Sequence, residues 1–136
     1  MCKQSMFEAV KEFHEATGLD INDVPVDMDE IFENELHELR LKLVTEEFKE
    51  FEVAMASGNL VDVADAIMDL HYVLSGTSVS FGIPEDECFA EVQRSNMSKI
   101  GPNGEVNRRE DGKILKHKDF SPPDLVGIIY GGDGEY

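Results

Sequence analysis

Apolar side chains recur at helical spacing from the first residues of the chain. In residues 4–16, Phe7, Val10 and Phe13 follow one another at intervals of three, which places them on one side of a helix. Gly18 comes directly after this segment and is a typical helix stop. The pattern therefore predicts an amphipathic first helix followed by a polar connector.

Two longer segments of helical period follow, separated by a short break. Residues 29–57 form the first, with or without a kink, and Gly58 is placed to end it. Its apolar positions are Leu36, Leu39, Leu43, Phe48, Phe51 and Met55. Asn59 is a good N-cap for the second segment, which runs to about residue 81 before Gly82. Because the connection is so short, the two helices should pack antiparallel.

The last third of the chain changes character. Pro84 suits a first helical turn, and the acidic residues after it are favoured by the helix dipole, so we expect a fourth helix to about residue 98. Two short extended runs then flank Asp111-Gly112, which indicates a small hairpin or an ordered loop. The prolines at 122–123 introduce a short final helix.

These elements predict an all-α fold, resembling an antiparallel four-helix bundle, with a small C-terminal hairpin or loop. We expect one domain over residues 1–136, with a core at about 4–125 and a loose tail at 126–136, because 136 residues suit a single domain.

The amino-acid composition limits which classes of partner the protein could bind and in which cellular compartment it is expected. With 12 Lys and Arg against 29 Asp and Glu, the net charge of −17 argues against binding to nucleic acid or to an anionic membrane. The two cysteines, Cys2 and Cys88, form no CxxC pair, and neither a signal peptide nor a membrane-spanning stretch is recognisable. We therefore expect a soluble cytoplasmic protein.

Carboxylates lie in stripes on the two long predicted helices. Glu47 and Glu50 are about 60° apart on the first, and Asp62, Asp65 and Asp69 fall within about 60° on the second. Solvated faces are the ordinary explanation of acidic helix positions. Here the second helix is apolar on nearly every other side, which predicts burial around most of its circumference. Its acidic stripe should therefore face inward or line a cleft.

No Lys or Arg occurs between Lys49 and Arg94 to neutralise these carboxylates, and a bound cation is the simplest alternative. Oxygen ligands select a hard ion, Mg²⁺ or Mn²⁺. Pro25 stands where an EF-hand loop would need glycine, and the sequence has no Glu-x-x-His pair of the di-iron type. Helix-bound Mg²⁺ with open positions commonly meets a phosphate-bearing substrate. Seven basic residues between positions 94 and 118 could supply the matching cationic wall.

The pattern EEFKE at 46–50, followed by DVAD at 62–65, resembles the EExxE and ExxD signature of the MazG-like all-α nucleoside triphosphate pyrophosphohydrolases. Further segments resemble a phosphoribosyl-ATP pyrophosphohydrolase-like group of phage and bacterial type, and the likeness extends over about residues 7–125. These segments are FHEATGL, ELRLKLVTEE, DVADAIMDLHYVLSGT, EVQRSNMSKIGPNGE, REDGKILK and FSPPDL. Asp62 stands where the family commonly has Glu, so Asp62 could bind metal through water, or Asp69 could share its role.

The resemblance implies hydrolysis of a nucleoside triphosphate between the α and β phosphates, giving a monophosphate and pyrophosphate. It also implies a role for each of the matching residues. The catalytic residues would be Glu46 and Glu47, the Mg²⁺ ligands Glu47, Glu50, Asp62 and Asp65, and the substrate contacts Asn96, Lys99, His14, Arg94 and Lys113. Participation of His71 stays open.

Three alternatives remain open on the sequence. Free nucleotides, with purine deoxynucleotides such as dGTP and dATP as one option, compete with phosphoribosyl-ATP as the substrate. A non-catalytic acidic helical binding protein is the third possibility. The superfamily resemblance further implies a homodimer, or a homotetramer built as a dimer of dimers.

Overall fold

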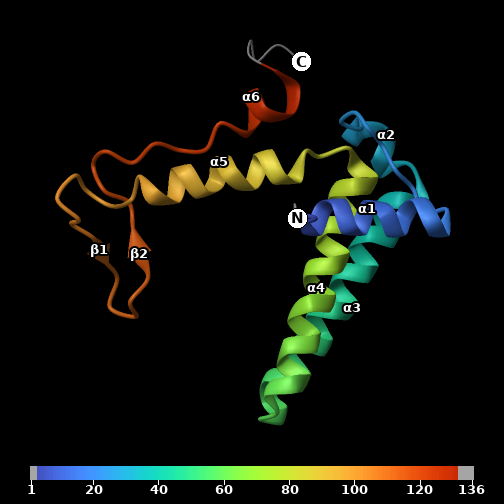
Figure 1. Ribbon diagram of the computed structural model, residues 1–136, viewed down its shortest axis with the longest axis horizontal. Coiled ribbons are helices and arrows are strands. Elements are labelled where there is room, and N and C mark those ends of the chain that lie inside the picture. The colour runs from blue at the N-terminus through green and yellow to red at the C-terminus, as the bar shows by residue number, and fades with distance from the viewer. Residues whose placement is uncertain (1–2, 132–136) are drawn as a thin grey trace. The chain divides into compact units, whose positions relative to one another are not determined.

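The computed structural model describes residues 3–131, which divide after Ile83 into two compact units. The described chain forms six helices and one two-stranded hairpin, so the predicted all-α fold class is confirmed (Figure 1). No helix among residues 3–131 is long and apolar enough to span a membrane. The assignment of all 136 residues to one domain stays a prediction.

The first unit is built on two long antiparallel helices, α3 (Glu35–Ser57) and α4 (Leu60–Phe81). Gly58 ends α3 in the left-handed conformation, with φ of 73°, and the Asn59 side chain accepts hydrogen bonds from the first turn of α4. The helix α1 (Met6–Thr17) packs against α4 (Figure 1). The predicted break, with Gly58 ending one helix and Asn59 capping the next, is confirmed.

The segment predicted as one helix over residues 29–57 is two helices, so the prediction of a continuous helix is wrong at residues 33–34. A short helix, α2 (Met28–Phe32), ends at Glu33, and the Asn34 side chain then accepts a hydrogen bond from the backbone N–H of Leu36 at 2.8 Å. Asn34 thus caps α3 from an extended conformation, which a continuous helix would not allow.

A buried polar network joins α3 to α4 in the first unit. Arg40 on α3 is 5% exposed, and it donates to the carbonyl oxygen of Val73 at 2.7 Å and to the hydroxyl of Thr77 at 3.2 Å. Burial lowers the pKa of this guanidinium. On α4, Gly76 leaves the room that Arg40 occupies, since a Cβ there would overlap the guanidinium. The network fixes the register of α3 against α4.

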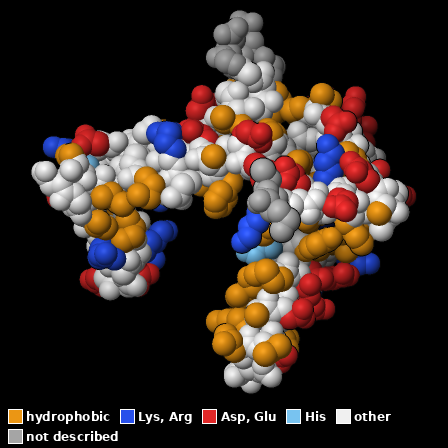
Figure 2. All heavy atoms as spheres, viewed as in Figure 1, with side chains coloured by type: hydrophobic (Ala, Val, Ile, Leu, Met, Phe, Trp, Pro, Cys, Tyr) orange, Lys and Arg blue, Asp and Glu red, His pale blue; other side chains and the backbone are white. Residues whose placement is uncertain are grey.

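The apolar side chains of α4 are far less buried than the sequence predicts. Leu60, Val61 and Met68 are 81%, 75% and 56% exposed, so burial of α4 around most of its circumference is wrong for this chain by itself. Figure 2 shows hydrophobic and acidic side chains gathered on opposite flanks of the α3–α4 pair in this view. A large apolar surface is therefore left without a partner within the first unit.

The second unit contains α5 (Glu85–Met97), the strands β1 (Asn107–Arg108) and β2 (Ile114–Leu115), and α6 (Leu125–Tyr130). The hairpin around Asp111-Gly112 is confirmed, and Pro84 takes the N-cap position of α5. Ordered structure continues through α6 beyond the predicted core limit, and the tail residues 132–136 lie outside the described part of the chain.

Candidate metal centre

Three carboxylates from the two long helices converge at one point. Glu47 and Glu50 lie one turn apart on α3, and Asp69 reaches them from α4. One oxygen from each residue lies within 4.8 Å of the oxygens of the other two. Within residues 3–131 this is the single group of at least three acidic, histidine or cysteine side chains close enough to share a metal ion.

The register of the helix pair explains why Asp69 belongs to this cluster. Arg40 on α3 contacts Thr77 on α4, and seven residues toward the turn from each of them lie Glu47 and Leu70. Glu47 is therefore level with the end of the acidic stripe that carries Asp69. Counting outward from the Gly58 turn would have given the same pairing from the sequence, because antiparallel helices joined by a tight turn pair residues equidistant from it.

The remaining aspartates of the stripe lie closer to the turn. By the same register, Asp65 is level with Glu52 and Asp62 with Met55, and neither aspartate joins the cluster. Metal binding by Asp62 and Asp65 stays a prediction. Asp69, considered in the sequence as a residue that could share the role of Asp62, lies with Glu47 and Glu50.

The electrostatics of Glu47 fit a cation site. Burial raises the pKa of its carboxyl, and the neighbouring charges of Glu50, Asp69 and Glu46 raise it further. Its Oε2 atom is buried and has no hydrogen-bond partner among the described residues. A buried anionic oxygen without a donor is costly, and a cation is the partner that would satisfy it together with the two other carboxylates. The donor set therefore fits a divalent metal with a preference for oxygen ligands.

Two histidines singled out in the sequence lie away from this cluster. His14 on α1 is 2% exposed, and its Nδ1 is 2.9 Å from the carbonyl oxygen of Asp20, which suits a structural role. His71 lines a small apolar cavity of about 140 Å³ between α1 and α4, together with Met68 and Tyr72. Neither ring joins the three carboxylates, and substrate contact by His14 stays a prediction.

The other predicted substrate contacts all belong to the second unit. Asn96 and Lys99, at the end of α5, line a common pocket of about 480 Å³. Arg94 instead donates to the Glu91 carboxylate at 2.7 Å, and Lys113 lies in the hairpin turn outside that pocket. The structure thus places Asn96 and Lys99 on one pocket whose lining includes neither Arg94 nor Lys113.

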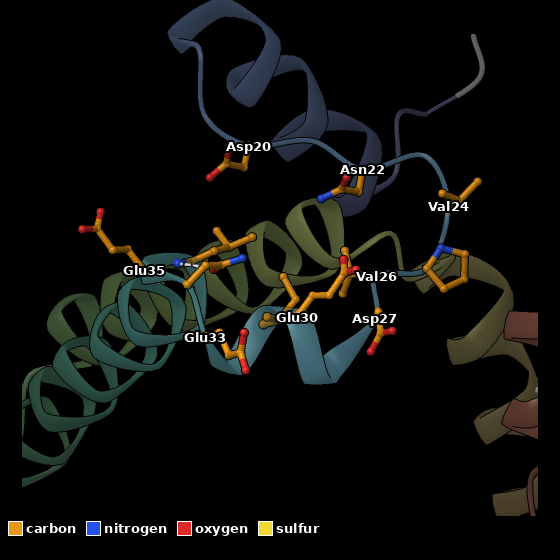
Figure 3. A pocket seen from close by; sticks show the side chains of 12 residues that line it. Asp20, Asn22, Val24, Val26, Asp27, Glu30, Glu33 and Glu35 are labelled. Atoms are coloured by element: carbon orange, nitrogen blue, oxygen red, sulfur yellow. Dashed lines mark hydrogen bonds between the residues drawn. The ribbon is translucent and has the colours of Figure 1, made fainter.

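A hollow of about 960 Å³ lies elsewhere in the first unit, where the connector before α2 passes over the start of α3 (Figure 3). Its wall carries Asp20, Asp27, Glu30, Glu33 and Glu35. No three of these described carboxylates converge as Glu47, Glu50 and Asp69 do. The three-carboxylate cluster is therefore the better candidate for a metal site, although this hollow is large.

Comparison with known proteins agrees with this geometry. The family model described as phosphoribosyl-ATP pyrophosphohydrolase matches residues 10–96, nearly two-thirds of the chain, including α3, α4 and all three clustered carboxylates. A search of curated proteins finds no match. The family is part of the MazG-like all-α superfamily, which confirms the resemblance noted in the sequence. The chain belongs to the phosphoribosyl-ATP pyrophosphohydrolase family and is a hydrolase of the nucleotide pyrophosphohydrolase kind.

Proposed function

We propose that this protein is a Mg²⁺-dependent pyrophosphohydrolase that cleaves nucleoside or deoxynucleoside triphosphates between the α and β phosphates. The products are the monophosphate and pyrophosphate. The observation that carries the proposal is the convergence of Glu47, Glu50 and Asp69 on the two helices that the family model covers. Purine deoxynucleotides, dGTP and dATP, are the substrates we would test first.

The metal is proposed as Mg²⁺, with Mn²⁺ able to substitute. Three carboxylates without sulfur or imidazole among them match the ligands that these hard ions prefer. A bound Mg²⁺ would supply charge neutralisation at the phosphate oxygens and a water of lowered pKa. Because the chain has a net charge of −17, it would repel a polyphosphate that no cation neutralises.

The chain's own residues then have distinct roles. Glu50 and Asp69 would hold the metal from opposite helices, and Glu47, whose pKa is raised by burial and by neighbouring carboxylates, would hold the metal or accept a proton from the attacking water. Glu46 is close enough to raise the pKa of Glu47 and is proposed to orient that water. Asp65 and Asp62, farther along the stripe, would contact a second ion or its waters.

A second candidate substrate is phosphoribosyl-ATP, favoured by the description of the matching family. Both substrates require the same metal-assisted attack on a phosphoric anhydride, so the three carboxylates serve either one. The two substrates differ in the group attached to the purine and not in the phosphate chain, so the metal cluster by itself would not distinguish them. A purely binding role for the acidic helices is the third reading, and it predicts no turnover.

We further propose that the protein works as a homodimer or a homotetramer. The exposed apolar side chains of α4 are the support for this proposal, because single soluble domains rarely leave so much apolar surface on one helix. Sedimentation velocity would test it, and a monomer that retains full turnover would refute it. A cytoplasmic location and the absence of nucleic-acid or membrane partners stay predictions.

The test of the function is product analysis on a panel of NTPs, dNTPs and phosphoribosyl-ATP in Mg²⁺ and in EDTA. We expect metal-dependent release of pyrophosphate that is lost in Asp69→Asn and retained to a greater extent in Asp62→Asn, its matched control on the same stripe. Equal loss in both variants would contradict the register argument. No turnover of any substrate would leave the binding-only reading.

A further inference from the structure

Arg40 on α3 is a buried charge without a counter-ion in the part of the chain that the structure describes. The residue is 5% exposed, and none of the ion pairs within residues 3–131 includes it. Burying an unpaired charge is costly, and an apolar side chain of similar volume at such a place is often neutral or stabilising. Stability alone therefore does not account for an arginine at this position.

The guanidinium of Arg40 contacts two acceptors that lie one turn apart on α4. Its Nε donates to the hydroxyl of Thr77 at 3.2 Å, and its Nη2 donates to the carbonyl oxygen of Val73 at 2.7 Å. The Thr77 hydroxyl donates to the same carbonyl at 2.9 Å, so the three groups form a closed ring of hydrogen bonds. Because the guanidinium is a rigid planar fork, it reaches both acceptors only at one axial position and one rotation of α4.

Gly76 shows that α4 is adapted to this contact. It lies in the interior of the helix, where glycine is less favourable than alanine. A Cβ at this position would overlap Nη2 of Arg40 and would lie 3.1 Å from Nε2 of His14. Two features that do not favour stability, an unpaired buried charge and a glycine within a helix, thus occur together at one contact. What this contact provides is a defined geometry of the helix pair.

The contact lies on the same seam between α3 and α4 as the three clustered carboxylates. On α3, Glu47 follows Arg40 by seven residues, so the two side chains are about 20° apart and two turns from each other. On α4, Asp69 precedes Val73 by one turn. A screw displacement of α4 by one residue would move Asp69 by about 1.5 Å and turn it by about 100°. Mg²⁺ tolerates little such change, because its ligands lie in near-ideal octahedral geometry at about 2.0–2.1 Å.

We propose that Arg40 is a positioning residue of the metal centre: by fixing the rotation of α4 against α3, it brings Asp69 to Glu47 and Glu50. The Gly58 turn fixes the other end of the seam, so the cluster lies between two defined contacts. Arg40 acts through the carboxylates and gives the helix pairing its specificity rather than its stability. The use of the metal in nucleotide hydrolysis rests on the proposed function; the positioning of the three carboxylates does not.

The test measures the affinity of the full-length protein for Mn²⁺, from the EPR signal of the free ion, together with thermal unfolding in EDTA. Arg40→Met removes the fork while the Thr77 hydroxyl keeps its bond to Val73, so we expect an unchanged or higher Tm. The affinity for Mn²⁺ should fall about tenfold or more, the usual effect of losing a group that orients metal ligands. Arg40→Lys keeps the charge without the fork, and its affinity for Mn²⁺ should fall as well.

Substitutions of Thr77 decide the same question if Arg40→Met does not fold. Thr77→Val removes the acceptor of Nε and should weaken Mn²⁺ binding about fivefold, whereas Thr77→Ser keeps the hydroxyl and should stay within about twofold of the wild type. Thr45→Val is the matched control. The Thr45 hydroxyl donates to the preceding turn of its helix, as that of Thr77 does, but it accepts no hydrogen bond from Arg40, so Mn²⁺ binding should be unchanged.

Wild-type affinity for Mn²⁺ in Arg40→Met and in Thr77→Val would overturn the inference, and so would retained affinity in Arg40→Lys. Equal losses in Thr77→Val and Thr45→Val, or a loss confined to variants whose Tm falls in EDTA, would indicate a merely structural role and would also overturn it. A wild type whose Mn²⁺ binding depends on Arg40, but which hydrolyses no nucleotide, would support Arg40 as a positioning residue and refute the proposed function.

Discussion

Replacing Glu47 by Gln should stabilise the metal-free protein while it removes the metal site. The glutamine keeps the size of the side chain and removes one of three negative charges that lie within 4.8 Å of one another. It sacrifices no hydrogen bond at Oε2, because that oxygen has no partner among the described residues. The expected gain therefore comes from relieved repulsion.

The size of the effect follows from the distances. Two unit charges 4.8 Å apart repel by about 0.9 kcal/mol at the dielectric constant of water, and Glu47 takes part in two such pairs. Screening at physiological salt reduces this repulsion by roughly half. We therefore expect a gain of about 1 kcal/mol, or a rise in Tm of about 3–5 °C for a chain of this size.

Thermal unfolding in EDTA at pH 7.5 measures this gain, with Glu52→Gln as the control. Glu52 lies on the same helix outside the cluster, so its replacement changes the net charge equally without relieving the local repulsion. In Mg²⁺ the order should reverse: an ion at a hundred times its Kd stabilises the wild type by about 2.7 kcal/mol, and Glu47→Gln should lose most of that gain. If Glu47→Gln lowers Tm in EDTA, or keeps the full Mg²⁺ response, the three carboxylates are not a metal site.

Two further predictions concern the scaffold. Gly82→Ala should lower the free energy of unfolding by about 2–5 kcal/mol in chemical denaturation, because φ is +69° and the new Cβ would overlap the carbonyl oxygen of Val24. Gly58→Ala, where φ is +73° and the Cβ would meet open space, should cost only about 1 kcal/mol. Equal losses in the two variants would refute the overlap. Glu91, whose pKa is lowered to about 2 chiefly by its hydrogen bonds from Arg94, contributes stability above the ordinary carboxyl pKa near 4.5 and loses it as the pH falls through about 2. The stability difference between wild type and Glu91→Gln should thus be larger at pH 6 than at pH 3, and a constant difference would contradict this pKa.

Local signals in the sequence were sufficient to predict most of the helices. The glycines at 18, 58 and 82 adopt the left-handed conformation that ends a helix, and Asn59 caps α4. The break before α3 was missed because the segment keeps a helical apolar period, while a single side-chain cap by Asn34 decides where the helix begins. Such a cap changes the helix start through a single hydrogen bond, which leaves the spacing of the apolar residues unaltered.

The sequence by itself determined the all-α class, the acidic stripes and the prediction of a hard metal ion, because these depend on residue type and helical spacing alone. Tertiary structure decided which aspartate faces Glu47 and Glu50. That choice depends on the register of α3 against α4, which the buried Arg40 fixes through Thr77 and the carbonyl of Val73. It also decided that Arg108, and not Arg109, shares a pocket with Lys99, because strand pairing assigns alternate side chains to opposite faces. Contacts between segments distant in sequence set both registers, and no local pattern contains them.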